Sequence, residues 1–188
     1  MKRLFVIVAA IGLVAGACGG NDDEAGSSSA AHNQADIEFV QGMIPHHEQA
    51  VTMSEFAASR AASPGVKTLA ARIQAAQAPE ITQMKGFLKD WGVKEESGGM
   101  GGMSGMGGGG DHPGMLGDGD LGRLKAAKGQ EFDRMFLQGM IGHHRGAITA
   151  GEAVRAEGQA PEAKALAGEI IKAQQAEIAE MEKLLTSV

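Results

Sequence analysis

The chain of 188 residues contains one cysteine, Cys18, one tryptophan, six phenylalanines and no tyrosine. A single cysteine excludes an internal disulfide, and it excludes metal sites that need several thiolates. The formal net charge is −6 and no cluster of Lys and Arg stands out, so nucleic acid is not expected as a partner. The residues give no support for a serine or cysteine nucleophile. The folded part must therefore be held by its apolar core or by bound ions.

Long apolar runs are also absent, apart from one near the start of the chain. Lys2 and Arg3 precede an apolar run at 4–14, which is too short for a comfortable membrane span. Small residues follow and end at Cys18. This pattern predicts a signal peptide at 1–18 with a lipobox-like end. An ordinary cleaved signal and an uncleaved anchor are the alternatives.

The leader also predicts a location. It resembles the signal of bacterial lipoproteins, whose cleavage leaves the cysteine as a lipidated first residue, so we expect a lipid on Cys18 to hold the chain at a membrane. Residues 19–34 are rich in Gly, Ser, Ala, Asn and Asp and predict a flexible tether. The expected location is the cell envelope, as an exported lipoprotein at the outer face of the cytoplasmic membrane or in the periplasm.

An internal repeat dominates the rest of the chain. Residues 36–88 align without a gap on residues 133–185, and 22 of the 53 aligned positions are identical. The match includes "GMIPHH" at 42–47 and "GMIGHH" at 139–144, which contain four of the six histidines. Apolar residues recur at helical spacing, and a proline opens the second half of each repeat. The expected helices are 35–61, 64–90, 130–157 and 161–187.

Each repeat therefore predicts an antiparallel helical hairpin with one apolar face. Two hairpins can bury these faces against each other, so the predicted fold is all-α, a four-helix bundle made of two tandem hairpins. This domain would span 35–188, with repeats at 35–91 and 128–188 joined by a Gly/Met-rich crossover at 92–127. Of the 26 residues at 97–122, 13 are glycine, so we expect no regular structure there.

The repeated histidine pairs predict a metal site. Met43 and His47 are four residues apart and share a helical face, so they can converge on one ion. Met140 and His144 repeat this pair. His46 shares a face with Met53, but Ala150 occupies the matching position in the second repeat. A symmetric site therefore cannot include Met53.

The second helix of each repeat adds polar residues to its apolar face. A glutamate that faces a core needs a partner. A histidine of the neighbouring helix can be its hydrogen-bond partner, or both can bind the same ion. The candidate metal ligands are Met43, His46, His47, Met140, His143, His144, Met53, Met84, Met181, Asp36, Asp133, Glu80 and Glu177.

The types of ligand favour a particular metal. Thioether and imidazole groups without thiolate suit Cu(I) or Ag(I), and imidazole also binds Cu(II). Copper as Cu(I) is therefore favoured, and zinc is not excluded, because His, Glu and Asp could supply a tetrahedral set. The crossover adds weaker candidate ligands, for which low-complexity drift is the alternative reading: Met100, Met103, Met106, His112 and Met115.

Both repeats weaken the helix at the histidine pair. Pro45 removes a backbone hydrogen bond directly before the first pair, and Gly142 loosens the helix at the matching place in the second repeat. We expect a kink or bulge there that turns His46 and His143 inward.

The repeated pattern resembles the bacterial domain-of-unknown-function-305 family. The resemblance rests on Asp36-x2-Phe39-x3-Met43-x2-His46-His47 and its copy, and it covers nearly all of 35–188. It implies a ferritin-like helical bundle of an exported protein, and some members of that family are periplasmic copper-binding proteins linked to copper resistance. The motif residues that it implies are Met43, His46, His47, Met140, His143 and His144.

Three functions are compatible with the sequence. The leading hypothesis is an exported, membrane-anchored protein that buffers or sequesters Cu(I) and passes it to a protein partner of unknown identity. The first alternative is a metal-free structural or interaction module, in which buried His–Glu and His–Asp networks set the helix register. A ferritin-like redox enzyme is less favoured, because the chain has no Glu-x-x-His motif. A non-enzymatic role is therefore expected.

Overall fold

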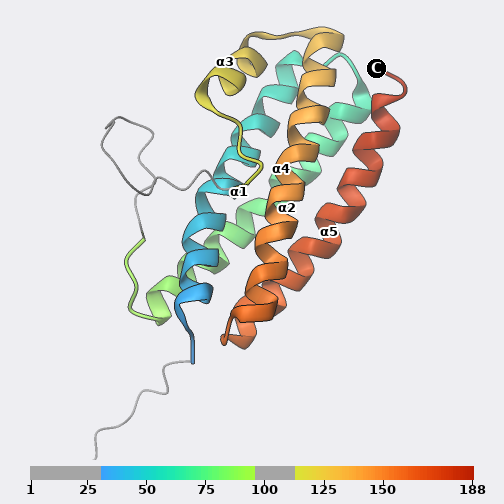
Figure 1. Cartoon of the computed structure of the whole chain (residues 1–188). Helices are drawn as coiled ribbons and strands as arrows, with labels where there is room; N and C mark the ends of the chain where they lie inside the picture. The colour runs from blue at the N-terminus through green and yellow to red at the C-terminus, as the bar shows by residue number, and fades with distance from the viewer. Residues whose placement is uncertain (1–30, 96–112) are drawn as a thin grey trace, which may run out of the picture.

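The computed structural model of the protein describes residues 31–95 and 113–188 (Figure 1). Within these residues the chain forms five helices and no strand: α1 (Gln34–Arg60), α2 (Pro64–Asp90), α3 (Asp118–Ala126), α4 (Gly129–Glu157) and α5 (Pro161–Leu185). The expected all-α fold is confirmed. No helix in this part of the chain is long and apolar enough to cross a membrane. The predicted signal peptide with Cys18 and the candidates Met100, Met103, Met106 and His112 lie outside the described residues.

The ends of the long helices follow from their capping residues. The Asn33 side chain accepts a hydrogen bond from the N–H of Asp36, and the Asp36 carboxylate accepts one from the Asn33 N–H, which completes a capping box. Ser63 caps α2, and Pro64 fills its first turn. α4 ends at Gly158. The observed bounds lie within two residues of the expected ones.

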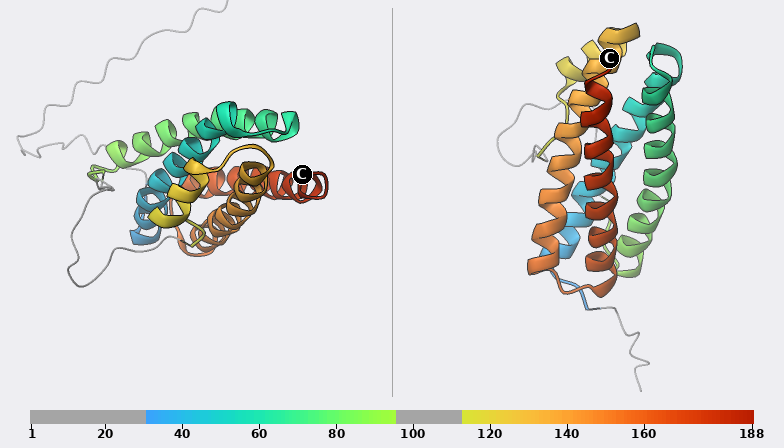
Figure 2. Two further views of the ribbon diagram at one scale, coloured as in Figure 1. Left: turned by 90° about the horizontal axis from the view of Figure 1, so that it is seen from above. Right: turned by 90° about the vertical axis from the view of Figure 1, so that its right-hand side faces the viewer.

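The four long helices lie side by side (Figures 1 and 2). α1 packs along α2, α4 packs along α5, and α1 also packs against α4. α2 and α5 touch more sparsely, and α3 lies against α1 and α4. Each expected hairpin is therefore present, and the first helices of the two hairpins are neighbours.

Two apolar clusters fill the space between the helices. The Phe136 cluster combines the second half of α1 with the first halves of α2 and α4, and it includes Met181 near the end of α5. The Trp91 cluster combines the first half of α1 with the second halves of α2 and α4, and it includes the first half of α5. α1 therefore runs antiparallel to both α2 and α4.

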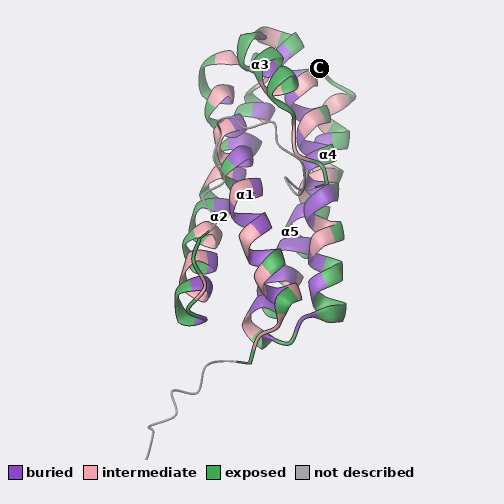
Figure 3. Cartoon of the chain, turned by 60° about the vertical axis from the view of Figure 1, so that its left-hand side comes forward, coloured by how far each residue is buried: buried purple, intermediate pink, exposed green. Residues whose placement is uncertain are grey.

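A layer of polar side chains separates the two clusters. On α1, residues of the Trp91 cluster precede the histidine pair and residues of the Phe136 cluster follow it, and α4 has the reverse order. Buried residues occur along each of the four long helices, with exposed residues between them (Figure 3). The members of this polar layer are His46, His47, Gln77, Glu80, His143, His144, Gln174 and Glu177.

The short helix α3 corrects one expectation. The glycine content predicts no regular structure at 97–122, yet α3 begins at Asp118. Leu121 and Leu124, three residues apart, share one helical face, and Leu124 is buried in the Phe136 cluster. Acidic residues in the first turn and basic residues in the last turn add favourable interactions with the helix dipole. The prediction is wrong because composition averaged over 97–122 hides a short amphipathic segment at its end.

A strap made of residues 113–117 precedes α3 and connects α1 with α4. The side-chain amide of Gln49 on α1 donates to the Leu116 carbonyl (2.9 Å) and accepts from the Leu116 N–H (2.8 Å). On α4, a Cβ added to Gly146 would overlap the Pro113 carbonyl. The strap is therefore held by hydrogen bonds on one side and packs directly on helix backbone on the other.

Gly146→Ala is expected to destabilise the protein by about 1–2 kcal/mol, although alanine normally stabilises a helix interior by about 0.5–1 kcal/mol over glycine. The added methyl group must displace the strap, which breaks both Gln49 hydrogen bonds at about 1 kcal/mol each and exposes packed surface. Urea unfolding measures the change. Gly142→Ala is the matched control, because a Cβ there meets nothing within 4 Å, and it should stabilise. Equal stabilisation by both variants would show that the strap does not pack on α4.

Candidate metal centre

His46 and His143 meet at the centre of the polar layer, where α1 packs against α4. Their ring centroids are 3.6 Å apart, with an interplanar angle of 36°, and both residues are buried. Both helices are continuous through Pro45 and Gly142. The expected inward position of the two histidines is therefore reached inside unbroken helices, and a bend at these points stays a prediction.

The second histidine of each pair contacts a glutamate of the neighbouring helix. Nε2 of His47 lies 2.8 Å from Oε2 of Glu80, and Nε2 of His144 lies 2.7 Å from Oε2 of Glu177. The histidine side chains are fully buried, whereas the two glutamate side chains are 20% and 17% exposed. The repeat therefore produces two equivalent His–Glu pairs, each within one hairpin, as the inward-facing glutamates predicted.

Five buried methionines flank the polar layer. Met43 and Met84 belong to the Trp91 cluster, whereas Met140 and Met181 belong to the Phe136 cluster. Met53 of the first repeat also belongs to the Phe136 cluster, and it is fully buried there. Because α1 and α4 are antiparallel, this methionine lies with the thioethers of the second repeat. The Phe136 cluster therefore contains three buried methionines, whereas the Trp91 cluster contains two, both from the first hairpin.

Asp36 lies away from the polar layer, although it was a candidate ligand. It precedes His46 by ten residues, which is about 15 Å along the helix axis. Its buried carboxylate accepts hydrogen bonds from the backbone N–H groups of Gln159 (2.8 Å) and Ala160 (3.0 Å), in the loop between α4 and α5. Asp36 therefore joins the first repeat to the loop of the second.

Asp133 makes the reciprocal contact. Its carboxylate accepts from the backbone N–H groups of Ala62 (3.1 Å) and Ser63 (2.9 Å), in the loop between α1 and α2. Each aspartate thus supplies an acceptor to the interhelical loop of the other repeat. The structure does not bring either aspartate together with the histidines.

Burial and neighbouring imidazoles govern the protonation of His143. Desolvation is the main cause that lowers the pKa of this histidine well below its usual value, and His46, His144 and His47 add to the effect. His143 is therefore neutral at pH 7, and a neutral imidazole is the form that binds metal ions.

The metal-free protein is expected to lose stability as the pH falls below about 6.5. The pKa of His143 is lowered in the folded state, so the unfolded chain takes up a proton that the folded protein does not. The contribution of His143 to the free energy of unfolding is fully present above the pKa of this residue in the unfolded chain. Below that pKa, the free energy of unfolding falls by up to about 1.4 kcal/mol per pH unit. Urea unfolding at pH 7.5, 6.5 and 5.5 measures this slope. His143→Gln should flatten it, and an unchanged slope in that variant would contradict the assignment.

One possible kind of metal site is a cluster of carboxylate, imidazole and thiolate groups. Among residues 31–95 and 113–188, no group of three or more His, Cys, Asp or Glu side chains is placed to hold an ion. The remaining described candidate, Met115, is half-buried in the strap.

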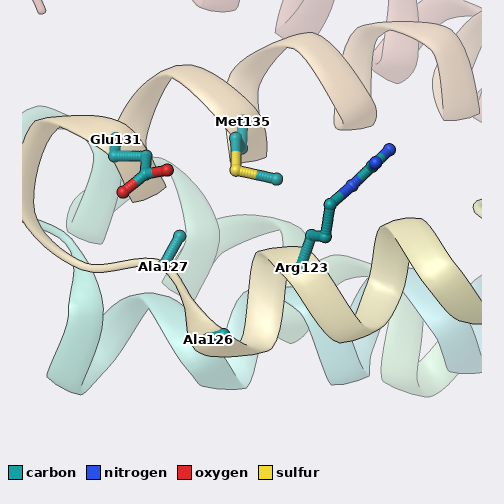
Figure 4. A pocket seen from close by; sticks show the side chains of 5 residues that line it. All are labelled: Arg123, Ala126, Ala127, Glu131 and Met135. Carbon is teal, nitrogen blue, oxygen red and sulfur yellow. The ribbon is translucent and has the colours of Figure 1, made fainter.

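Two surface cavities lie away from the histidines. One of about 280 Å³ is lined by Arg123, Ala126, Ala127, Glu131 and Met135, between α3 and the start of α4 (Figure 4). Another of about 290 Å³ adjoins it and includes Leu116 and Gly139. Neither cavity is lined by a histidine. The candidate centre is instead an internal layer of the packed helices, because all four of its histidines are buried.

Sequence reasoning missed the residues that cover this layer. A Cβ added to Gly114 of the strap would be 3.0 Å from the Cα of His143, so the strap passes directly over the backbone of this histidine. Gln49 and Gly146, which hold and accommodate the strap, occupy equivalent positions in the two repeats. The sequence shows this difference between the repeats. Identical residues at the two positions could not supply both the hydrogen bonds of Gln49 and the space that Gly146 leaves for the strap.

Comparisons with known proteins identify relatives. A family model described as "Domain of unknown function (DUF305)" matches residues 36–185. A DUF305 protein of Streptomyces coelicolor, assigned as secreted, is 30% identical, with a TM-score of 0.70 over 81% of this chain and 93% of that chain. CopM in its Cu(II)-bound form is 32% identical, with a TM-score of 0.68 over 81% and 96% of the two chains. CopM structures also exist in Cu(I)-bound and Ag-bound forms.

A curated viral protein matches a shorter part. The uncharacterized protein L153 of Acanthamoeba polyphaga mimivirus is 40% identical over 55 residues, which are 29% of this chain and 36% of L153. The match therefore spans about a third of the viral protein. The matched segment of 55 residues is about as long as one repeat of this chain.

Proposed function

The chain belongs to the DUF305 family, and we propose that it is an exported protein that binds copper through Met and His side chains of its packed helices. The observation that carries this proposal is the pair of equivalent, fully buried histidines with thioethers on both sides of the polar layer. Each hairpin contributes one of these histidines and two methionines of a single apolar cluster, Met43 and Met84 in the first hairpin and Met140 and Met181 in the second. The copper- and silver-bound forms of CopM support the same ions for this chain.

The chemistry of the set favours Cu(I). Thioether sulfur and neutral imidazole nitrogen are ligands that a soft, monovalent ion prefers, and Cu(II) also accepts imidazole. Apolar clusters adjoin the layer on both sides, and a monovalent ion loses less hydration energy than a divalent ion on entering such surroundings. Zinc is the less favoured ion, because it prefers thiolate, imidazole and carboxylate groups in a tetrahedral arrangement.

The proposal includes the form and location of the protein. The two hairpins form a ferritin-like four-helix bundle, with the segment between the repeats as its crossover. A lipid on Cys18 holds the domain at the outer face of the cytoplasmic membrane or in the periplasm. There the protein buffers or sequesters Cu(I), and the linker residues Met100, Met103, Met106 and His112, with Met115 of the strap, capture ions more weakly.

Metal analysis tests the proposal directly. Protein purified from cells supplied with both copper and zinc is expected to contain copper, measured by elemental mass spectrometry. The metal-free protein should then take up Cu(I) from a chromophoric chelator. Protein that contains no metal and fails to compete for Cu(I) would overturn the proposal, and exclusive retention of zinc would replace copper with zinc.

One observation favours a second candidate function. Both His–Glu pairs satisfy a ring nitrogen without any ion, as a metal-free module with a buried polar network requires. Such a module predicts no high-affinity copper uptake. The same titration therefore separates the two functions.

A further inference from the structure

We propose that each hairpin binds one ion through the Nδ1 atom of its second histidine, His47 or His144, and that Glu80 and Glu177 are positioning residues that set this geometry. The inference rests on the proposed function. It assigns the ligating nitrogen, the number of equivalent sites and the role of the glutamates, which the candidate ligand set left open.

The glutamates select the tautomer. An ionised carboxylate only accepts hydrogen bonds, so a contact of 2.8 Å between His47 Nε2 and Glu80 requires the proton on Nε2. The contact of 2.7 Å between His144 and Glu177 has the same requirement. In a neutral ring the lone pair then resides on Nδ1. This is the carboxylate–histidine arrangement that orients metal-binding imidazoles in many proteins.

The Nδ1 atoms are available for an ion. Nδ1 of His47 and Nδ1 of His144 are both buried, and neither has a hydrogen-bond partner in the protein. Both residues are 0% exposed. A buried acceptor without a partner costs free energy, and a bound cation would satisfy it. The same state occurs at the two equivalent positions, which indicates a shared purpose rather than a local packing defect.

Thioethers lie on the side toward which these rings lean. Helical side chains tilt toward the N-terminus of their helix, so the His47 ring leans toward the turn that carries Met43. Met84 of α2 belongs to the same apolar cluster as Met43. Nδ1 of His47 with the sulfurs of Met43 and Met84 therefore forms the ligand set of the first hairpin.

The second hairpin repeats this set with His144, Met140 and Met181. Met53 also lies in that cluster, and its methyl group would be 3.6 Å from a Cβ added to Gly139, next to Met140. The second site therefore has an additional thioether within its cluster. We expect it to bind Ag(I) or Cu(I) more tightly than the first site.

Nuclear magnetic resonance of protein labelled with ¹⁵N in histidine tests the nitrogen assignment, with Ag(I) as the probe ion. In the metal-free protein, His47 and His144 are expected to carry their proton on Nε2. With Ag(I) bound, scalar coupling between silver and nitrogen should appear at Nδ1 of both residues. Coupling at Nε2 would overturn the inference while leaving the proposed function intact. Failure to bind Ag(I) at all would overturn both the inference and the proposed function.

Substitution of the glutamates separates positioning from direct ligation. The double variant Glu80→Leu/Glu177→Leu is expected to bind Ag(I) about 10–100-fold more weakly, with mixed tautomers of both histidines. Glu80→Gln/Glu177→Gln is the matched control, because an amide oxygen still accepts from Nε2–H, and it should keep the Nδ1 coupling and most of the affinity. If the Gln variant loses as much affinity as the Leu variant and Nδ1 shows no coupling, the glutamates are ligands. Thermal unfolding of each variant shows whether it folds.

Discussion

With His46, His47, His143 and His144 all replaced by alanine, the protein is expected to bind Cu(I) at least about a thousandfold more weakly than the wild type. Loss of a residue that only supports a ligand already costs about 10–100-fold in metal affinity, and this variant removes every imidazole of the polar layer. The remaining methionines are soft but uncharged, and they lack the stronger nitrogen donors. Competition with a chromophoric Cu(I) chelator measures the change.

Two controls keep this result interpretable. A variant with glutamine at the same four positions retains polar groups in the layer and reports the loss of imidazole in a folded protein, which circular dichroism verifies. A variant with leucine at Met100, Met103 and Met106 should keep the tight sites and lose only weak binding. Tight binding that survives in the histidine variants would show that the histidines are not required. Loss of tight binding in the linker variant would place the copper site in the linker.

Asp36→Ala is expected to destabilise the metal-free protein by about 3 kcal/mol. The substitution leaves the N–H groups of Asn33, Gln159 and Ala160 without their carboxylate acceptor. Hydrogen bonds to a charged group contribute about 1.5–3 kcal/mol each, and partial access of water to the loop offsets part of the loss. In a domain of about 150 residues this corresponds to a fall of roughly 10 °C in Tm. Urea and thermal unfolding measure both quantities.

Matched substitutions define what the carboxylate contributes. Asp36→Asn keeps one acceptor oxygen and should lose about half as much stability. Asp90→Ala, at the exposed end of α2, should stay within about 0.5 kcal/mol of the wild type. Copper affinity should be nearly unchanged in all three folded variants, because Asp36 does not reach the polar layer. A selective loss of copper binding without a loss of stability would return Asp36 to the ligand set.

Signals confined to one helix or one hairpin made much of the structure predictable. Pro64 and Pro161 indicated helix starts, because a proline at the first position sacrifices no hydrogen bond, and both helices begin there. The gapless repeat indicated that His47 and His144 have equivalent surroundings, and both contact a glutamate. Spacing along a helix determines such features, and the sequence displays that spacing directly.

Contacts between the repeats could not be predicted in this way. Nothing in the local pattern says that α1 runs antiparallel to α4, and this direction places Met53 with the second repeat. It also brings Asp36 to a distant loop and Gln49 to the strap. A polar residue on an inner face can be a ligand, a cap or a clamp, and only its neighbours in space distinguish these roles.

The exchange of loop contacts between the repeats has the form of an isologous interface, in which residue i of one subunit contacts residue j of the other and j contacts i. Asp36 reaches residues 159 and 160, and Asp133 reaches residues 62 and 63, which are the same positions after a shift of 97. One repeat by itself therefore carries both complementary halves of a twofold contact. The two repeats are therefore arranged like the two subunits of a homodimer that are joined in one chain. Because they are joined, the two halves can differ in sequence, as they do at Met53 and at the residues that contact the strap.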